Sequence, residues 1–195
     1  MTDEKNIVNF LFEVGMLSKT PRSGFYFLGS GEQSVAEHIN RVCFIGYTLS
    51  MMDGKVDVGK VLKMCLFHDV GEARTSDLNY VHQKYAQANE EQAVTELSST
   101  LPFGEDIQST LTEYRNRKSL ESLYAKDADS LEFILSLKEQ YDTGNIKAQT
   151  WLPSAVKRLK TDIAKSLAAI ILKTDSDEWW FGNKQDDWWI TRGKE

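Results

Sequence analysis

Apolar residues recur at helical spacing along most of this chain. Near the start, the i, i+3, i+4, i+7 pattern of a buried helix face is formed by Ile7, Phe10, Leu11 and Val14. A convincing alternation of apolar and polar residues, which would indicate a half-buried strand, is missing. The pattern therefore predicts an all-α fold, with helices over residues 4–16, 35–52, 57–73, 82–100, 105–117, 119–141 and 153–173.

Several residues mark where these helices begin and end. Ser34 and Glu37 match a capping box, in which the hydroxyl and the carboxylate bond to free amides at a helix start. Gly54 favours the end of that helix, and Pro153 fits the first turn of the last one. Residues 18–33 carry Pro21 and three glycines and break any helical period, so we expect a loop there.

The length and composition favour one domain with a substantial core. The chain has 195 residues, 41% of them hydrophobic, and a net charge of -6 without a run of lysine or arginine. A nucleic-acid polymer or an anionic membrane surface would therefore be poorly attracted, whereas this charge does not exclude a small charged ligand. No secretion signal is recognisable at residues 1–16, and no apolar run approaches the roughly 20 residues of a membrane span.

The two cysteines, Cys43 and Cys65, each lie among apolar residues at helical spacing. This placement is typical of reduced thiols packed in a core and does not suggest a disulfide framework. Together with the lack of a secretion signal, it predicts a cytoplasmic location.

The doublet His68-Asp69 at the end of an apolar helix indicates the chemistry. A buried ionised carboxylate is costly unless a cation or a partner compensates it, and a metal ion would do so. Taken alone, His38 is more simply interpreted as a hydrogen-bonded core histidine. Because the buried carboxylate of Asp69 needs a cation to compensate its charge, we favour His38 as a ligand of a metal ion at that carboxylate. Two histidines with Asp69 and the distant Asp129 would form a mixed nitrogen and oxygen site of the kind that holds zinc, manganese, cobalt or iron.

Glu72 follows His68 by four residues, so on a continuous helix its carboxylate lies one turn along the same face. There it could orient a metal-activated water or pass a proton, while the ion accepts a phosphoryl oxygen. The alternative for Glu72 is a solvated acid on a helix surface, but its register with the doublet favours a catalytic role. This combination predicts hydrolysis of a phosphoester.

Four segments of the chain, in order, resemble those of the HD-domain metal-dependent phosphohydrolases, and most closely their 5'-deoxynucleotidases. The resemblance covers about residues 5–142 and rests on Pro21–Phe25, Ser34–His38, His68–Glu72 with Asp77, and Ala125–Asp129. It implies an HD-domain helical bundle. We expect residues 1–195 to form a single HD domain, with a C-terminal helix and a tryptophan-rich tail within residues 143–195.

The resemblance also implies roles for individual residues. The implied metal ligands are His38, His68, Asp69 and Asp129. They would hold one divalent ion, which could be Mn, Co, Zn, Fe or Mg. Glu72 corresponds to the acid beside the attacking water, and Asp77 to an acid near the reacting centre and the sugar. Arg22 corresponds to an arginine that binds the 5'-phosphate, and Phe25 to a ring that stacks on the base.

Asp127 is a rival to Asp129 as the distant ligand, because it lies on the apolar stripe of its helix. The family places its ligand three residues after a lysine, which here is Lys126, and this favours Asp129.

Two positions depart from the family pattern. Family members commonly carry tryptophan after the arginine, where this chain has Phe25 and Tyr26, and Ser76 stands where glycine often precedes the acid. Both departures concern the shape of the sugar and base pocket.

The C-terminal tail holds four of the five tryptophans within eleven residues, in Glu178–Gly182 and Asp187–Ile190. These rings could pack onto the domain surface, because exposing them to water would favour association. Alternatively they form a dimer contact or a partial lid over the site.

These features predict an enzyme that removes phosphate from a (deoxy)nucleoside 5'-monophosphate through a metal-activated water. One alternative is a phosphohydrolase of the same superfamily that acts on a deoxynucleoside triphosphate or ppGpp. Another is a non-catalytic metal-binding module. The expected partner is a small nucleotide, with no nucleic-acid polymer and no membrane, and the resemblance favours a homodimer.

Overall fold

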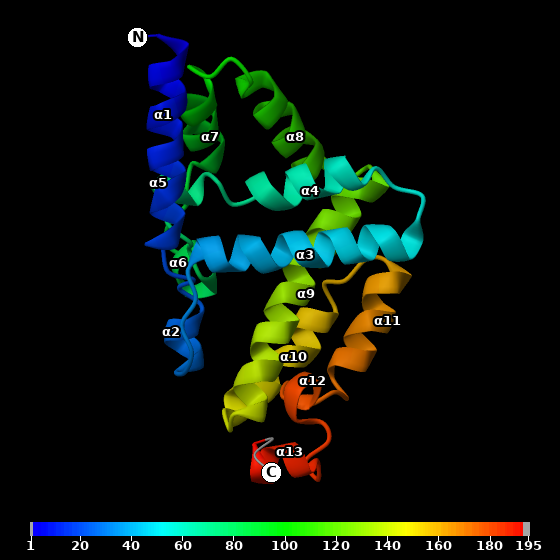
Figure 1. The fold of residues 1–195 in the computed structure, drawn as a ribbon. Helices are drawn as coiled ribbons and strands as arrows, with labels where there is room; N and C mark the ends of the chain where they lie inside the picture. The colour runs from blue at the N-terminus through cyan, green and yellow to red at the C-terminus, as the bar shows by residue number, and fades with distance from the viewer. Residues whose placement is uncertain (1, 193–195) are drawn as a thin grey trace.

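The computed structural model describes residues 2–192, which fold into helices joined by turns and loops (Figure 1). The elements are α1 (Asp3–Val14), the 3₁₀ helix η1 (Gly15–Ser18), α2 (Phe25–Leu28), α3 (Val35–Asp53), α4 (Val58–Phe67), α5 (Glu72–Thr75), α6 (Tyr80–Gln83), α7 (Glu90–Ser98), α8 (Gly104–Asn116), α9 (Leu120–Asp142), α10 (Ile146–Val156), α11 (Asp162–Ile171), α12 (Glu178–Phe181) and α13 (Asp187–Thr191). The predicted all-α fold is confirmed. None of these helices is long and apolar enough to cross a bilayer.

The longest helix, α9, packs against α3, α4, α10 and α11 and forms the centre of the main core (Figure 1). The largest fully buried side chains of this core are Leu49, Met64, Leu131, Ile134 and Leu137. Burying a side chain of this size contributes about 1.5–3 kcal/mol. The packing therefore fixes α9 against α3 and α4, and these three helices carry the candidate site.

Local signals place α3 as predicted. The Ser34 hydroxyl accepts a hydrogen bond from the amide of Glu37 (3.2 Å), and the amide of Ser34 donates to the Glu37 carboxylate (2.7 Å), which completes the capping box. At the other end Gly54 adopts a φ of 71°, in the left-handed region that glycine reaches without steric cost. The predicted helix over residues 35–52 is confirmed.

The predicted continuous helix over residues 57–73 is wrong. The helix α4 ends at Phe67, and a turn separates it from α5, which begins at Glu72. The two parts pack into different clusters, because Met64 and Cys65 belong to the main core whereas Val70 packs with residues of α1, α7 and α8. The chain must therefore turn between them. The predicted helix over 82–100 is likewise divided, into α6 and α7.

The predicted helix over residues 153–173 is also wrong. Pro153 lies inside α10, and a new helix, α11, begins after residue 161. The hydroxyl of Thr161 caps α11 by accepting a bond from the amide of Ala164 (3.3 Å). Asp127 of α9 accepts hydrogen bonds from the amides of Lys160 and Thr161 at 2.8 and 2.7 Å. The break is thus set by a carboxylate from a distant part of the sequence.

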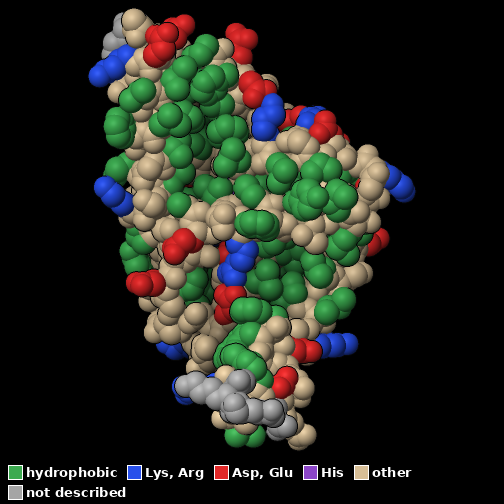
Figure 2. Space-filling model, in the orientation of Figure 1, with side chains coloured by type: hydrophobic (Ala, Val, Ile, Leu, Met, Phe, Trp, Pro, Cys, Tyr) green, Lys and Arg blue, Asp and Glu red, His purple; other side chains and the backbone are tan. Residues whose placement is uncertain are grey.

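The tail forms the short helices α12 and α13, whose rings pack on one another. Trp180 and Phe181 stack at 5.2 Å between ring centroids, and Trp188 meets Trp189 at 4.8 Å. Trp179 keeps 86% of its surface exposed. Figure 2 shows hydrophobic side chains at this end of the molecule. No described tail residue lines the cavity at the candidate site, so the arrangement does not support the lid.

Candidate active site

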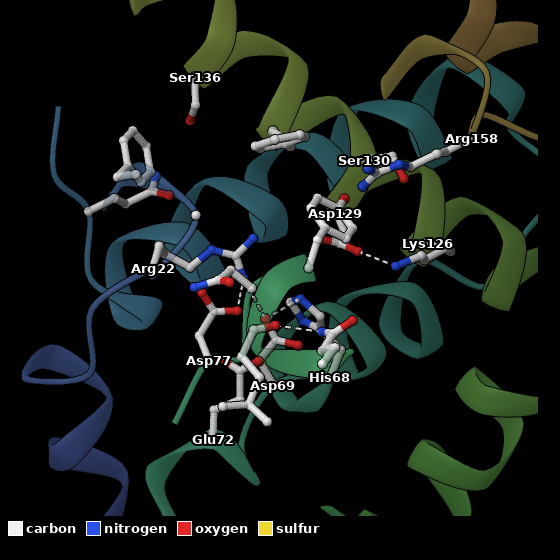
Figure 3. Close-up of a pocket in the computed structure, with 18 of the residues that line it drawn as sticks. Arg22, His68, Asp69, Glu72, Asp77, Lys126, Asp129, Ser130, Ser136 and Arg158 are labelled. Atoms are coloured by element: carbon white, nitrogen blue, oxygen red, sulfur yellow. Dashed lines mark hydrogen bonds and ion pairs between the residues drawn. The ribbon is translucent and has the colours of Figure 1, made fainter. Parts of the chain in front are cut away.

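The first turn of α3 and the end of α4 bring three of the predicted metal ligands, His38, His68 and Asp69, into one group, and Asp129 from the middle of α9 approaches His38. His38 lies on α3 and is fully buried, and His68 stands at the C-terminal end of α4. Asp69 follows in the turn, and Asp129 projects from α9. Figure 3 shows His68 and Asp69 beside each other, with Asp129 on the neighbouring helix.

The Nε2 atom of His38 is the common point of this group. It lies 3.3 Å from His68 Nε2, 3.5 Å from Asp69 Oδ2 and 3.3 Å from Asp129 Oδ1. His68 Nε2 lies 3.1 Å from Asp69 Oδ2. The ligand atoms of His38, His68 and Asp69 all fall within 4.8 Å of one another, a spacing that lets one ion contact all three.

The charges of the group suit a cation. Burial would raise the pKa of Asp69, but the charge and hydrogen bond of His68 hold that pKa well below its usual range. Burial would likewise raise the pKa of Asp129, but Lys126, whose Nζ lies 2.6 Å from Asp129 Oδ2, holds it low. Both acids are therefore anionic. Two imidazoles and two carboxylates are donors that zinc, manganese, cobalt and iron accept.

Hydrogen bonds at the far side of both rings orient them toward the group. His68 Nδ1 lies 2.8 Å from the backbone carbonyl oxygen of Cys65, and His38 Nδ1 lies 2.6 Å from Glu132 Oε2. Burial and the charge of Arg22 would lower the pKa of His38, but hydrogen bonds to Asp129 and Glu132 raise that pKa to about 9. In both rings Nε2 is the atom left to face the acids.

Glu72 lies at the start of α5 and is 9% exposed. Its Oε2 atom is buried and has no hydrogen-bond partner among the described residues. Burial and the charges of Asp69 and Asp77 raise the pKa of Glu72 to about 10. Buried polar atoms are normally paired, so this unpaired oxygen near Asp69 and Asp77 fits a site that is completed by a cation and its solvent.

Arg22 lies just before α2 and approaches both Asp69 and Asp77. Its Nη1 atom lies 3.3 Å from Asp69 Oδ2 and 3.7 Å from Asp77 Oδ1 (Figure 3). Ser23 anchors this segment, because its amide donates to Asp77 Oδ2 (2.7 Å) and its hydroxyl donates to the Asp77 carbonyl (2.6 Å). Arg22 and Asp77 are thereby held as one unit.

Ser76, which precedes Asp77, adopts a φ of 63° and a ψ of 162°. This backbone region is populated almost only by glycine, and other residues pay about 1–3 kcal/mol to occupy it. The departure noted in the sequence therefore falls where glycine would relieve strain.

A cavity of about 410 Å³ opens at this group of residues. The predicted residues that line it are Arg22, Phe25, His68, Asp69, Glu72, Asp77 and Asp129. Neither Tyr26, which is 65% exposed, nor Phe27 is among its lining residues, so of the three rings in the loop only Phe25 reaches the cavity. The predicted loop at 18–33 contains the short helix α2, which carries Phe25.

The aromatic part of the cavity was not predicted from the sequence. Phe133, Trp151 and Tyr80 line it together with Arg158. The rings of Phe133 and Trp151 lie 6.4 Å apart. The Arg158 guanidinium lies 5.1 Å from the Tyr80 ring and 5.5 Å from the Phe133 ring. Phe133 lies one turn beyond Asp129 on α9, a signal that the sequence did contain.

Asp127 and Asp129 project from α9 to different places. Asp127 is fully buried, and its carboxylate accepts bonds from the Thr161 amide and hydroxyl, both at 2.7 Å. Asp129 lines the cavity and approaches His38. The rival acid is thus engaged in capping α11.

The sequence profile of the HD domain matches residues 14–171, a stretch that includes every one of these site residues. The chain belongs to the HD domain family. The 5'-deoxynucleotidase HDDC2 of Dictyostelium discoideum is similar to this HD-domain chain, with 31% identity over 190 residues, which cover 88% of this chain and 98% of the relative. The 5'-deoxynucleotidase HDDC2 of Bos taurus is 29% identical over 149 residues, which cover 72% of this chain and 71% of the relative.

Among solved structures, a conserved hypothetical protein from Pyrococcus furiosus is 31% identical to this HD-domain chain, with a TM-score of 0.71, and the match covers 85% of this chain and 97% of that protein. The resemblance inferred from the four sequence segments is confirmed by the family match.

Proposed function

We propose that this HD-domain protein is a metal-dependent 5'-deoxynucleotidase, which hydrolyses deoxynucleoside 5'-monophosphates to nucleoside and inorganic phosphate. The observation that carries the proposal is the grouping of His38, His68 and Asp69, with Asp129 against His38, beside a cavity that Glu72 and Arg22 also line. The names of the relatives from Dictyostelium discoideum and Bos taurus support the same activity.

The metal ligands in this proposal are His38, His68, Asp69 and Asp129. A divalent ion bound by them would lower the pKa of a coordinated water toward neutrality and draw charge from the phosphoryl oxygens. The identity of the ion is left to experiment among Mn, Co, Zn, Fe and Mg, since nitrogen and oxygen donors accept several of these.

The residues around the ligands supply the remaining steps. Arg22 binds the phosphate through its planar fork of donors, and Asp69 and Asp77 hold that fork in place. Glu72 accepts a proton from the attacking water, because a cation at the site offsets the acids that raise the pKa of Glu72. The P–O5' bond breaks as the water oxygen bonds to phosphorus, and the 5'-oxygen leaves as a hydroxyl by taking up a proton from solvent. Asp77 lies next to Arg22, where the sugar joins the phosphate.

The aromatic part of the cavity is the natural place for the base. Phe25 comes from α2, Phe133 from α9 and Trp151 from α10, and together they offer flat apolar faces to a heterocycle. Along α9, the seven residue-to-residue steps from Asp129 to Ser136 rise about 10 Å, so one helix runs beside the cavity from the proposed metal ligand toward the other end of the cavity.

Phosphate release tests the proposal. The purified protein, freed of metal with a chelator, is given Mn, Co, Zn or Mg and a panel of deoxy- and ribonucleoside monophosphates, deoxynucleoside triphosphates and ppGpp. We expect inorganic phosphate from the deoxynucleoside monophosphates, and its loss in Glu72→Ala with metal still bound. Preferred turnover of a triphosphate or ppGpp would indicate the other superfamily enzyme, and no turnover of any member would indicate the binding module.

We further propose that the protein acts as a homodimer in the cytoplasm. The exposed rings of the tail, including Trp179 and Trp188, and the outward Phe44 on α3 offer apolar surface for a second copy. The free thiols of Cys43 and Cys65 suit a reducing compartment. Sedimentation velocity would give twice the chain mass for a dimer, and the monomer mass would contradict it.

A further inference from the structure

Glu132 forms a buried network immediately behind the candidate metal site. Its side chain is 1% exposed, although it carries a charge and lies on the central helix α9. Its partners come from two parts of the chain, residues 33–41 and Ser136, and include His38. An acid buried this deeply requires compensation, and the network supplies it.

The two carboxylate oxygens of Glu132 have separate partners. Oε1 accepts from Gln33 Nε2 (2.7 Å), from Arg41 Nε and Nη2 (3.0 and 2.8 Å) and from the Ser136 hydroxyl (3.0 Å). Among the described residues, Oε2 is left for His38 Nδ1, at 2.6 Å. The Arg41 fork and Gln33 thus fix the carboxylate, and the free oxygen is presented to one imidazole nitrogen.

This contact determines which nitrogen of His38 can bind an ion. A carboxylate oxygen only accepts, so Nδ1 carries a hydrogen; when an ion takes the place of the proton that Nε2 shares with Asp129, the lone pair of the neutral ring is on Nε2. Nε2 is the atom that lies 3.3 Å from Asp129 Oδ1 and 3.5 Å from Asp69 Oδ2. The same ring is too deeply buried to be oriented by water.

We propose that Glu132 is a positioning residue, which holds His38 in the tautomer and orientation required for metal binding and raises the basicity of Nε2. The inference rests on the metal site proposed above. Carboxylate partners of ligating histidines act in this way, and removing one costs about 10- to 100-fold in metal affinity.

The two histidines differ in this respect. His68 is oriented by the backbone carbonyl of Cys65, which no side-chain change removes, whereas the orientation of His38 depends on a side chain. Substitution at position 132 therefore alters one ligand and leaves the other ligands untouched.

A rival explanation is that Glu132 only neutralises Arg41. Glu139 provides the matched control, because it pairs with Arg41 Nη1 at 2.5 Å on the same helix but has no contact with His38. If the role of Glu132 were charge balance, Glu139→Gln would resemble Glu132→Gln. If the role is positioning, the two variants separate.

The experiment titrates metal-free protein with Co²⁺ by calorimetry and by the visible absorption of the bound ion. We expect Glu132→Gln and Glu132→Asp to bind Co²⁺ about 10- to 100-fold more weakly than the wild type, since one loses the charge and the other the reach. Glu139→Gln should bind within about threefold of the wild type, as expected for a charge outside the contact. Equal affinity of Glu132→Gln and the wild type would overturn the proposal, as would an equal loss in Glu139→Gln. Co²⁺ affinity does not depend on nucleotide turnover. The binding experiment therefore still tests the role of Glu132 if the protein proves to have no nucleotidase activity.

Thermal unfolding of the metal-free variants checks that they fold, and a measurement on the wild type covers the case in which the position 132 variants do not. The chain has three histidines. In the zinc-loaded protein, nitrogen-resolved NMR should show a slowly exchanging Nδ1 proton on His38. A His38 ring that carries its proton on Nε2, or that binds through Nδ1, would refute the assignment.

Discussion

Arg22 Nη1 lies 3.3 Å from Asp69 Oδ2, so the cation proposed to bind phosphate touches an acid proposed to bind the metal. The contact links the two halves of the site. In the proposed function, an incoming phosphate would accept hydrogen bonds from Arg22, and the ion would compensate the charge of Asp69. Without either ligand, the two residues compensate each other.

Arg22→Gln should therefore have opposite effects on the two ligands. Loss of the phosphate donor should lower kcat/KM for deoxynucleoside monophosphates by about 10- to 100-fold. Metal affinity should rise by a few-fold, because a positive charge next to Asp69 disappears. Steady-state kinetics and calorimetry measure the two effects. Arg74→Gln is the control, since Arg74 pairs with Glu13 and Glu96 away from the cavity. A fall in both quantities would contradict the linkage.

Glu72 predicts a pH dependence of stability. Its pKa is about 10 in the folded metal-free protein and near 4.5 in an unfolded chain, so the folded state binds the proton more tightly. The contribution of Glu72 to stability is complete below pH 4.5 and is lost as the pH rises toward 10. Glu72→Gln should thus become more stable than the wild type as pH rises, by up to about 1.4 kcal/mol per pH unit. Urea unfolding of both metal-free proteins at pH 5 and pH 8 measures the gap, and a gap that does not change with pH would argue against a protonated Glu72.

Asp127 and Asp129 should separate stability from metal binding. Asp127→Asn disturbs the bonds to Lys160 and Thr161 that start α11, and should lower the free energy of unfolding by about 2 kcal/mol with metal affinity retained. Asp129→Asn should weaken metal binding more than about tenfold, with little loss of metal-free stability. Urea unfolding and calorimetry on both variants provide the comparison. The reverse pattern would make Asp127 the ligand.

Trp151 should contribute to binding of the base and not to binding of the phosphate. Trp151→Ala should raise KM for deoxynucleoside monophosphates by about 5- to 150-fold, equivalent to the loss of roughly 1–3 kcal/mol of stacking. Hydrolysis of deoxyribose 5-phosphate, which has no base, should change little. Trp179→Ala is the matched control, because Trp179 is exposed on the tail and does not line the cavity. An equal loss with both substrates would place Trp151 outside the base site.

The parts of the fold that could be predicted are those set by neighbouring residues. The helix over 35–52 was predictable because Ser34 and Glu37 cap it within one turn and Gly54 ends it. The helix boundaries at 67 and 161 were not predictable, because the first depends on packing into two clusters and the second on Asp127 of another helix.

The same division applies to the candidate site. The doublet His68-Asp69 and the nearby Glu72 could be grouped from spacing, and the family resemblance added Arg22 and Asp129. Glu132 could not be found in this way, since its contact with His38 joins residues 94 apart. The local sign of Glu132 is that an acid stands between two hydrophobic residues, the buried Leu131 and the partly buried Phe133.

The central helix α9 carries Asp129, which approaches His38, Glu132, which contacts the other nitrogen of that ring, and Phe133, which lines the aromatic part of the cavity. A helix buried on most sides cannot stretch, so these three groups keep a constant separation whatever the surrounding loops do. Ligands of different length must then be accommodated by the segments across the cavity, α2 and α6. Related chains that act on substrates of different size should accordingly differ in the residues of those two short helices and not in those of α9.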